Sequence, residues 1–80
     1  MRTNRKRAKE IIRRATKTEY NQLIEEAFLT VRQQKILLMK KTNEQIASWQ
    51  IANTLNVSVD TVNHEILKIY DKIIRVIDGV

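Results

Sequence analysis

The chain has 80 residues, a formal net charge of +6, 42% hydrophobic residues, no cysteine and no proline. Such a length gives one small domain, near the lower limit of what a single apolar core can stabilise. Without cysteine there is neither a disulfide framework nor a thiolate metal site, and one glycine with no proline favours an all-α fold.

The apolar residues do not form a membrane span or a secretory signal. The longest apolar run, residues 36–39, is far shorter than the ~20 residues that cross a bilayer. The charged N-terminus has no apolar stretch after it. We therefore expect a cytoplasmic protein without membrane contact.

The excess positive charge lies in residues 1–18, which we expect to form a basic N-terminal arm or helix before a domain at residues 19–80. This arm carries eight basic residues and one acidic residue (+7), whereas residues 19–80 carry seven basic and eight acidic residues (−1). Because basic side chains on phosphates release counterions, the arm suits a nucleic acid; a solubilising tail is the alternative. The expected phosphate contacts here are Arg2, Arg5, Lys6, Arg7, Lys9, Arg13 and Arg14.

A first helix is predicted from about Arg5 to Thr16, with a narrow apolar stripe of Ala8, Ile11, Ile12 and Ala15. The helical spacing continues through residues 20–28, so one long helix is possible on spacing alone. We favour a break near residues 16–18, where Thr18 can cap a separate helix that begins at Glu19.

The next helix begins after Thr30, an N-cap residue with Gln33 three positions on, as a capping box requires. It ends near Met39 or Lys40, before a polar loop at residues 41–44. For residues 45–49 we favour a helix that starts near Ser48. The alternative is a longer helix, capped by Asn43.

Residues 49–69 predict a helix-turn-helix. The inner face of the first helix is Ile51, Ala52 and Leu55; the turn is Asn56 and Val57; and the second helix returns Val62, Ile66 and Ile69 to the core. Ser58 can cap the second helix by accepting from a free N–H group of its first turn. In this motif the second helix lies in the major groove of DNA.

The last helix is expected to run from Ser58 to about Ile77 and carries two apolar stripes. The first stripe is Val62, Ile66, Ile69, Ile73 and Val76, and it must pack on the helix-turn-helix. The second stripe, which we expect at a homodimer interface, is Leu67, Tyr70, Ile74 and Ile77. The alternative is burial within the chain by Leu23, Ile24, Ala27 and Phe28.

Residues 29–39, 51–62 and 69–73 are similar to the DNA-binding domains of LuxR/GerE-type regulators and to region 4 of bacterial sigma factors. The matching motifs are Leu29-Thr30, Ile51-Ala52, and Val57-Ser58 with Thr61-Val62. The resemblance implies a tetrahelical helix-turn-helix, and the long last helix predicted above would be its recognition helix. Two departures are a longer loop before Ile51 and Asn56 in place of the usual turn glycine, which Asn can replace.

The outward arc of the second motif helix supplies the expected base contacts, which are Val59, Thr61, Asn63 and His64. Asn63 can pair with adenine through two hydrogen bonds, and His64 can donate to guanine. Further phosphate contacts are expected from Ser48, Trp49, Gln50, Ser58 and Lys68. For Trp49 we favour a partly buried core anchor, and the contact with the sugar-phosphate backbone is the alternative.

Catalysis has little support, because one histidine and no cysteine leave no nucleophile with a base, and no cluster has metal-ligand spacing. We expect no enzyme activity, no cofactor and no metal. The expected function is sequence-specific binding of double-stranded DNA by a small repressor or activator, such as those of phages or mobile elements. The alternatives are an accessory that marks a DNA site for a terminase, relaxosome or RNA polymerase, and a protein-interaction module.

Overall fold

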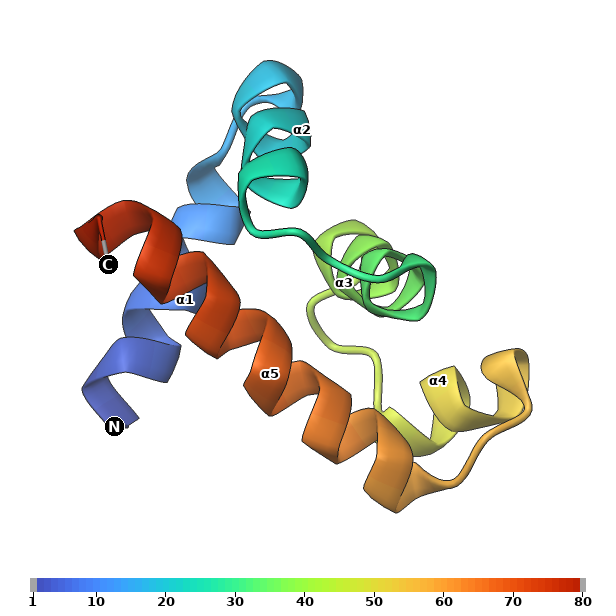
Figure 1. Ribbon diagram of the computed structural model, residues 1–80. Coiled ribbons are helices and arrows are strands. Elements are labelled where there is room, and N and C mark those ends of the chain that lie inside the picture. The colour runs from blue at the N-terminus through green and yellow to red at the C-terminus, as the bar shows by residue number, and fades with distance from the viewer. Residues whose placement is uncertain (1, 80) are drawn as a thin grey trace.

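The C-terminal helix α5 organises the fold. The computed structural model describes residues 2–79, with side chains from residue 5 onward. The helices of this part are α1 (Arg2–Arg14), α2 (Lys17–Glu26), α3 (Val31–Thr42), α4 (Ser48–Leu55) and α5 (Val59–Asp78). Twenty residues of helix extend ~30 Å, so α5 nearly spans the 33 Å longest dimension of the molecule. Each of the other four helices packs against it (Figure 1).

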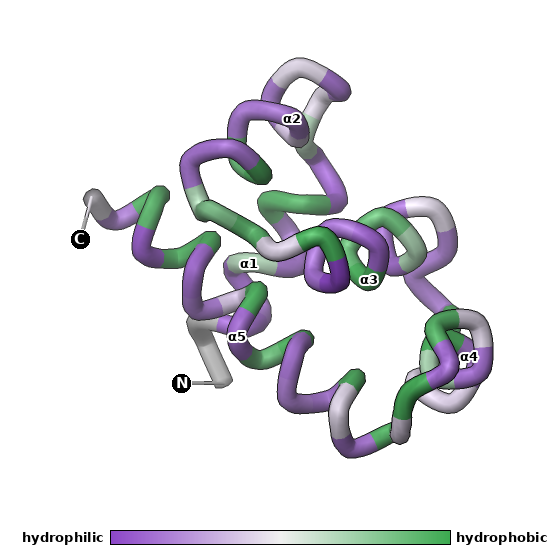
Figure 2. Tube along the Cα trace, turned by 45° about the vertical axis from the view of Figure 1, so that its right-hand side comes forward, coloured by the Kyte–Doolittle hydropathy of each residue, from purple (hydrophilic) through white to green (hydrophobic). Residues whose placement is uncertain are grey.

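The core follows the first apolar stripe of α5. The largest side chains that are fully buried are Val62, Ile69 and Ile73 from α5, together with Ile36 from α3 and Ile51 from α4. Along α5, apolar and polar residues alternate with the repeat of a helix (Figure 2). The described part of the chain is therefore all-α, with a long last helix, as predicted.

A capping box separates α1 from α2. Thr16 Oγ1 accepts from the Glu19 N–H (3.2 Å), and a Glu19 carboxylate oxygen accepts from the Thr16 N–H (2.9 Å). The Thr16 N–H, and to a smaller extent the Thr16 hydroxyl, lower the pKa of Glu19 because they favour its charged carboxylate. The predicted break is confirmed, but Thr18 as its cap is wrong, since Thr16 holds that position.

Lys41 closes the C-terminal end of α1. Its Nζ donates to the carbonyl oxygens of Ile12 (2.8 Å) and Ala15 (3.2 Å) and lies 5.5 Å from the ring centre of Tyr20. A cation at this position satisfies carbonyls that have no partner within the helix. Because Lys41 belongs to α3, the predicted loop at residues 41–44 is wrong at its start, and the loop begins at Asn43.

The capping box predicted for α3 is confirmed. Thr30 Oγ1 accepts from the Gln33 N–H, and Gln33 Oε1 accepts from the Thr30 N–H, both at 3.1 Å. Gln33 is buried and its Oε1 also accepts from Lys72 Nζ at 2.8 Å. The same amide therefore starts α3 and ties it to α5.

Helix α1 packs on α5, and two of the four residues of the second apolar stripe, Tyr70 and Ile74, are buried. Ala8 is fully buried and Ile12 nearly so, and they lie in the same core cluster as Tyr70 and Ile74. Burial within the chain, the alternative to a dimer interface, thus accounts for these two residues; Ala27 and Ile24 belong to the same core, but Phe28 does not. Phe28 is 84% exposed, in a left-handed turn (φ 53°) after α2.

None of the helices described is both long and apolar enough to cross a membrane.

Candidate nucleic-acid interface

Helices α4 and α5 meet at a short turn, as the sequence predicted. Helix α4 begins at Ser48, and α5 begins after Ser58, whose Oγ accepts from the Thr61 N–H at 3.1 Å. Between them Asn56 adopts a left-handed conformation (φ 57°, ψ 47°), and the Val57 N–H donates to the Ala52 carbonyl at 3.0 Å. A residue with φ > 0 is what ends a helix in this way, and Asn tolerates it.

The solvent-facing side of the first half of α5 is mostly polar. Asn63, His64 and Lys68 are exposed, Val59 is 41% exposed, and Thr61 is half-buried. On the opposite side Val62 is fully buried, so packing fixes the orientation of the helix. Of the four expected base contacts, three are therefore accessible and Thr61 only partly so.

Ser48 holds the side chain of Asn63. Its Oγ donates to Asn63 Oδ1 at 2.8 Å, and this hydrogen bond links the start of α4 to the first half of α5. One lone pair of Oδ1 and both N–H groups of the amide remain for a ligand. Asn63 is thus the one expected base contact whose side chain a second helix positions.

The hydroxyl groups at the start of α5 are already engaged with each other. Ser58 Oγ and Thr61 Oγ1 are 2.8 Å apart, and Ser58 also caps the helix. Ser58 therefore has a structural role whether or not it meets a phosphate. Lys68, further along α5, is exposed and forms an ion pair with the half-buried Glu65 at 3.7 Å.

The start of α4 presents an aromatic side chain to solvent. Trp49 is 58% exposed, so its interpretation as a partly buried core anchor is wrong. Gln50 is exposed, and its Oε1 accepts from the Ala47 N–H at 2.9 Å, which closes the first turn. The free N–H groups of such a turn favour an anion.

The basic residues of α1 divide into two groups. Ion pairs join Arg7 to Asp78 (2.9 Å) and join Arg13 and Arg14 to Glu10 (2.9 and 3.2 Å). These contacts raise the pKa of Arg7 and of Arg13. The exposed residues without an ion pair among the described side chains are Arg5, Lys6 and Lys9. The side chain of Arg2 lies outside the described part.

Lys9 faces a cleft of about 280 Å³ between α1 and α3. Across it lies Lys40, half-buried, whose pKa is lowered by burial and by the charge of Lys9. The sequence did not indicate Lys40 as a functional candidate, because only the packing of α1 on the rest of the fold brings Lys9 to the same cleft. The only sequence signal of Lys40 is a charge in the last turn of α3, which is equally typical of a helix end.

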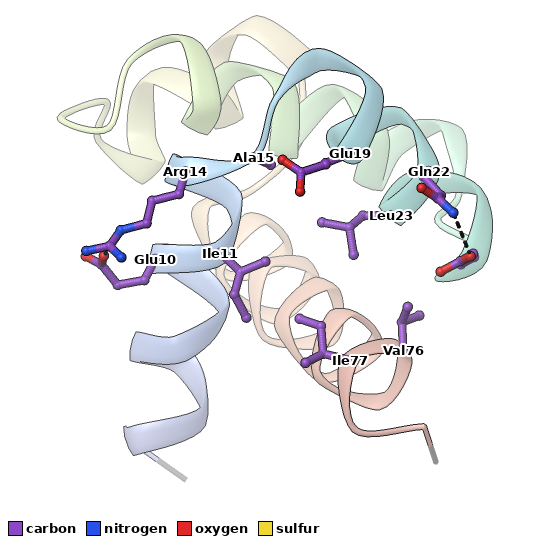
Figure 3. Close-up of a pocket in the computed structure, with 10 residues that line it drawn as sticks. Glu10, Ile11, Arg14, Ala15, Glu19, Gln22, Leu23, Val76 and Ile77 are labelled. Carbon is purple, nitrogen blue, oxygen red and sulfur yellow. Dashed lines mark hydrogen bonds and ion pairs between the residues drawn. The ribbon is translucent and has the colours of Figure 1, made fainter.

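A second, open groove of about 560 Å³ lies between α1, α2 and the end of α5. Ile11, Leu23 and Ile77 point into it, and glutamates lie at its edge (Figure 3). Ile77 is 37% exposed and Leu67 half-buried, whereas Tyr70 and Ile74 are buried inside the chain. Contact with a second copy through the latter two would require α1 to leave its place.

Among the described residues, no group of three or more histidine, cysteine, aspartate or glutamate side chains is placed to hold a metal ion. Comparison with known proteins found no matching family model, no matching curated protein and no matching solved structure. The arguments for a function therefore come from the chemistry of these surfaces.

Proposed function

We propose that this protein is a sequence-specific regulator of transcription that binds double-stranded DNA, with the first half of α5 in the major groove. The observation that carries this proposal is Asn63, exposed on α5 and held by Ser48 from α4. An amide fixed in this way is suited to the two hydrogen bonds that distinguish adenine. We include in this proposal the resemblance to the DNA-binding domains of LuxR/GerE-type regulators and to sigma-factor region 4.

The surroundings of Asn63 support the same function. His64 and Val59 are exposed beside it and can contact a guanine acceptor and a thymine methyl group. The first turn of α4 offers free N–H groups for the phosphate backbone. The net charge of +6 supplies the general attraction to DNA on which specific contacts build.

We further infer that two copies bind together to a site with two-fold symmetry. A domain of this size makes few base contacts, and pairing doubles them at half-sites one helical turn apart. The accessible apolar residues at the end of α5 and in the adjoining groove, Ile77 and Leu23 among them, offer the surface for such pairing.

The test begins with selection of bound duplexes from a random pool. On the selected site, Asn63→Ala should weaken binding by about 1–3 kcal/mol and relax specificity at one base pair. Asn53→Ala is the matched control, since Asn53 is an exposed residue of α4. Failure to enrich any duplex, or equal behaviour of the two variants, would contradict the proposal. A symmetric site bound by two copies would support pairing.

A second candidate function, a protein-interaction module, is favoured by the groove in Figure 3 and by the 84% exposed side chain of Phe28. Exposed aromatic residues beside an apolar groove are common at protein interfaces. This function predicts partner binding that Phe28→Ala weakens and Asn63→Ala leaves unchanged.

A further inference from the structure

The cleft between α1 and α3 has a charge pattern that its own residues do not balance. Among its lining side chains, Arg13 is paired with Glu10 at 2.9 Å and lies 4.0 Å from Glu44. Lys41 is turned away to the carbonyl oxygens at the end of α1. The cations left over are Lys9 and Lys40.

Both lysines line this cleft, and the charge of Lys9 is felt at Lys40, where with burial it lowers the pKa. None of the ion pairs among the described side chains involves either lysine. The single hydrogen bond of Lys40 Nζ is a long one, 3.5 Å, to the Ile46 carbonyl. Two like charges at a half-buried position repel each other, and the repulsion is relieved when an anion sits between them.

The position of the cleft indicates which anion it meets. Ile46, the hydrogen-bond partner of Lys40, is two residues before Ser48, where α4 begins and where Asn63 is held. The cleft is therefore lined by residues of the loop that leads into α4, Glu44 and Gln45, and by Tyr70 of α5. Its two lysines add positive charge on the approach to the surface proposed to contact bases.

We propose that Lys9 and Lys40 form a seat for one phosphate group, the backbone phosphate that flanks the base pairs contacted by α5. This assignment rests on the proposed function for its occupant. The chemistry of the seat, two ammonium groups around one phosphate in a cleft of about 280 Å³, does not depend on it. The seat gives α1 a defined place on the duplex, in contrast to an arm that contacts phosphates at random.

The first arm of the test uses inorganic phosphate and the full chain. Side-chain NMR signals of Lys9 and Lys40 should shift together and saturate, whereas those of Lys17 and Lys35, both exposed, should not. Lysine signals that all drift alike, without saturation, would overturn the seat.

The second arm measures binding to a short mixed-sequence duplex as a function of salt. The double variant Lys9→Gln/Lys40→Gln is compared with Lys17→Gln/Lys35→Gln, which has the same net charge. One lost phosphate contact lowers the slope of log K against log[salt] by about 0.9. We expect that loss in the first variant only; the single variant Lys9→Gln, at an exposed position, repeats the comparison with no change to the half-buried lysine.

The two arms separate the possible failures. If the wild-type chain binds duplex and both double variants keep its slope, the phosphate seat is not on DNA, while the proposed function stands. If phosphate saturates Lys9 and Lys40 but the wild type binds no duplex, the seat takes a free phosphate compound, and the proposed function fails. If phosphate saturates neither lysine and the wild-type chain binds no duplex, both proposals are wrong.

Discussion

The two halves of α5 have similar apolar spacing but very different surroundings. In the first half, residues 59–68, only Val62 is buried; in the second half, residues 69–78, Ile69, Tyr70, Ile73 and Ile74 all are. One line of residues shows the change most clearly, because it passes from exposed Asn63 through half-buried Leu67 to Tyr70 and Ile74. Helix α1 packs on α5 (Figure 1), and its Ala8 and Ile12 lie in the same core cluster as Tyr70 and Ile74.

This difference shows how a small domain can present a rigid binding surface. The second half of α5 supplies the core, and because an α-helix is stiff, it fixes the first half in space as well. The exposed residues therefore lose less freedom on binding than residues of a loop would. Stability and binding should consequently respond to different substitutions on one helix.

The largest expected effect comes from a pair of substitutions, one in each half. Ile73→Ala removes a fully buried side chain and should lower the free energy of unfolding by about 2–5 kcal/mol. His64→Ala, at an exposed position, should change it by less than about 0.5 kcal/mol. Urea unfolding followed by circular dichroism measures both. Comparable losses would mean that the two halves do not divide the roles.

A smaller effect is expected where α1 meets α5. Ala8 is fully buried, and Ala8→Leu should cost about 1–3 kcal/mol of unfolding free energy, since the added atoms must push the helices apart. Ala15→Leu is the matched control, because Ala15 borders the open groove and has room for the larger side chain. If Ala8→Leu were harmless, α1 would be a loose arm and the second half of α5 would lack its cover.

Local signals allowed much of this fold to be predicted. The capping box at Thr30, the cap at Ser58 and the left-handed turn at Asn56 each depend on a few neighbouring residues, and all are present. Thr16 was missed because Thr18 offers the same hydroxyl nearby, and the two differ only in whether a glutamate follows at the third position. Here Glu19 follows Thr16 at that spacing.

What the sequence did not provide is the pairing of helices. The apolar stripe of α1 is narrow, so nothing local indicated that it joins Tyr70 and Ile74 in the core while Phe28 stays exposed. Trp49 was ambiguous for a related reason, since a large aromatic residue next to buried Ile51 can face either way. Lys9 and Lys40 likewise line one cleft only after α1 and α3 have taken their places in the fold.

The smallest expected effect is on the pH dependence of stability, and it distinguishes the cap at the start of α5 from the capping box between α1 and α2. The cap of α5 is a serine hydroxyl, which does not titrate in acid, whereas the corner between α1 and α2 uses the carboxylate of Glu19. The folded pKa of Glu19 lies below its usual value of 4.5. Its contribution to stability is therefore complete above about pH 4.5 and is lost as the pH falls towards the folded pKa, since the unfolded chain then binds more protons.

Glu19→Gln should flatten this acid dependence, and at neutral pH it should cost only the small contribution that the wild type loses in acid. A glutamine can still close the box, as Gln33 and Gln50 do at α3 and α4, but it carries no titrating group. Thermal unfolding between about pH 3 and pH 6 measures the effect, with Glu25→Gln as a control that removes the same charge from α2 outside the box. If the two variants changed the profile equally, the acid response would come from net charge. If only Glu19→Gln changed the profile, the acid response would come from the capping box between α1 and α2. The first half of α5 would then be unaffected by acid.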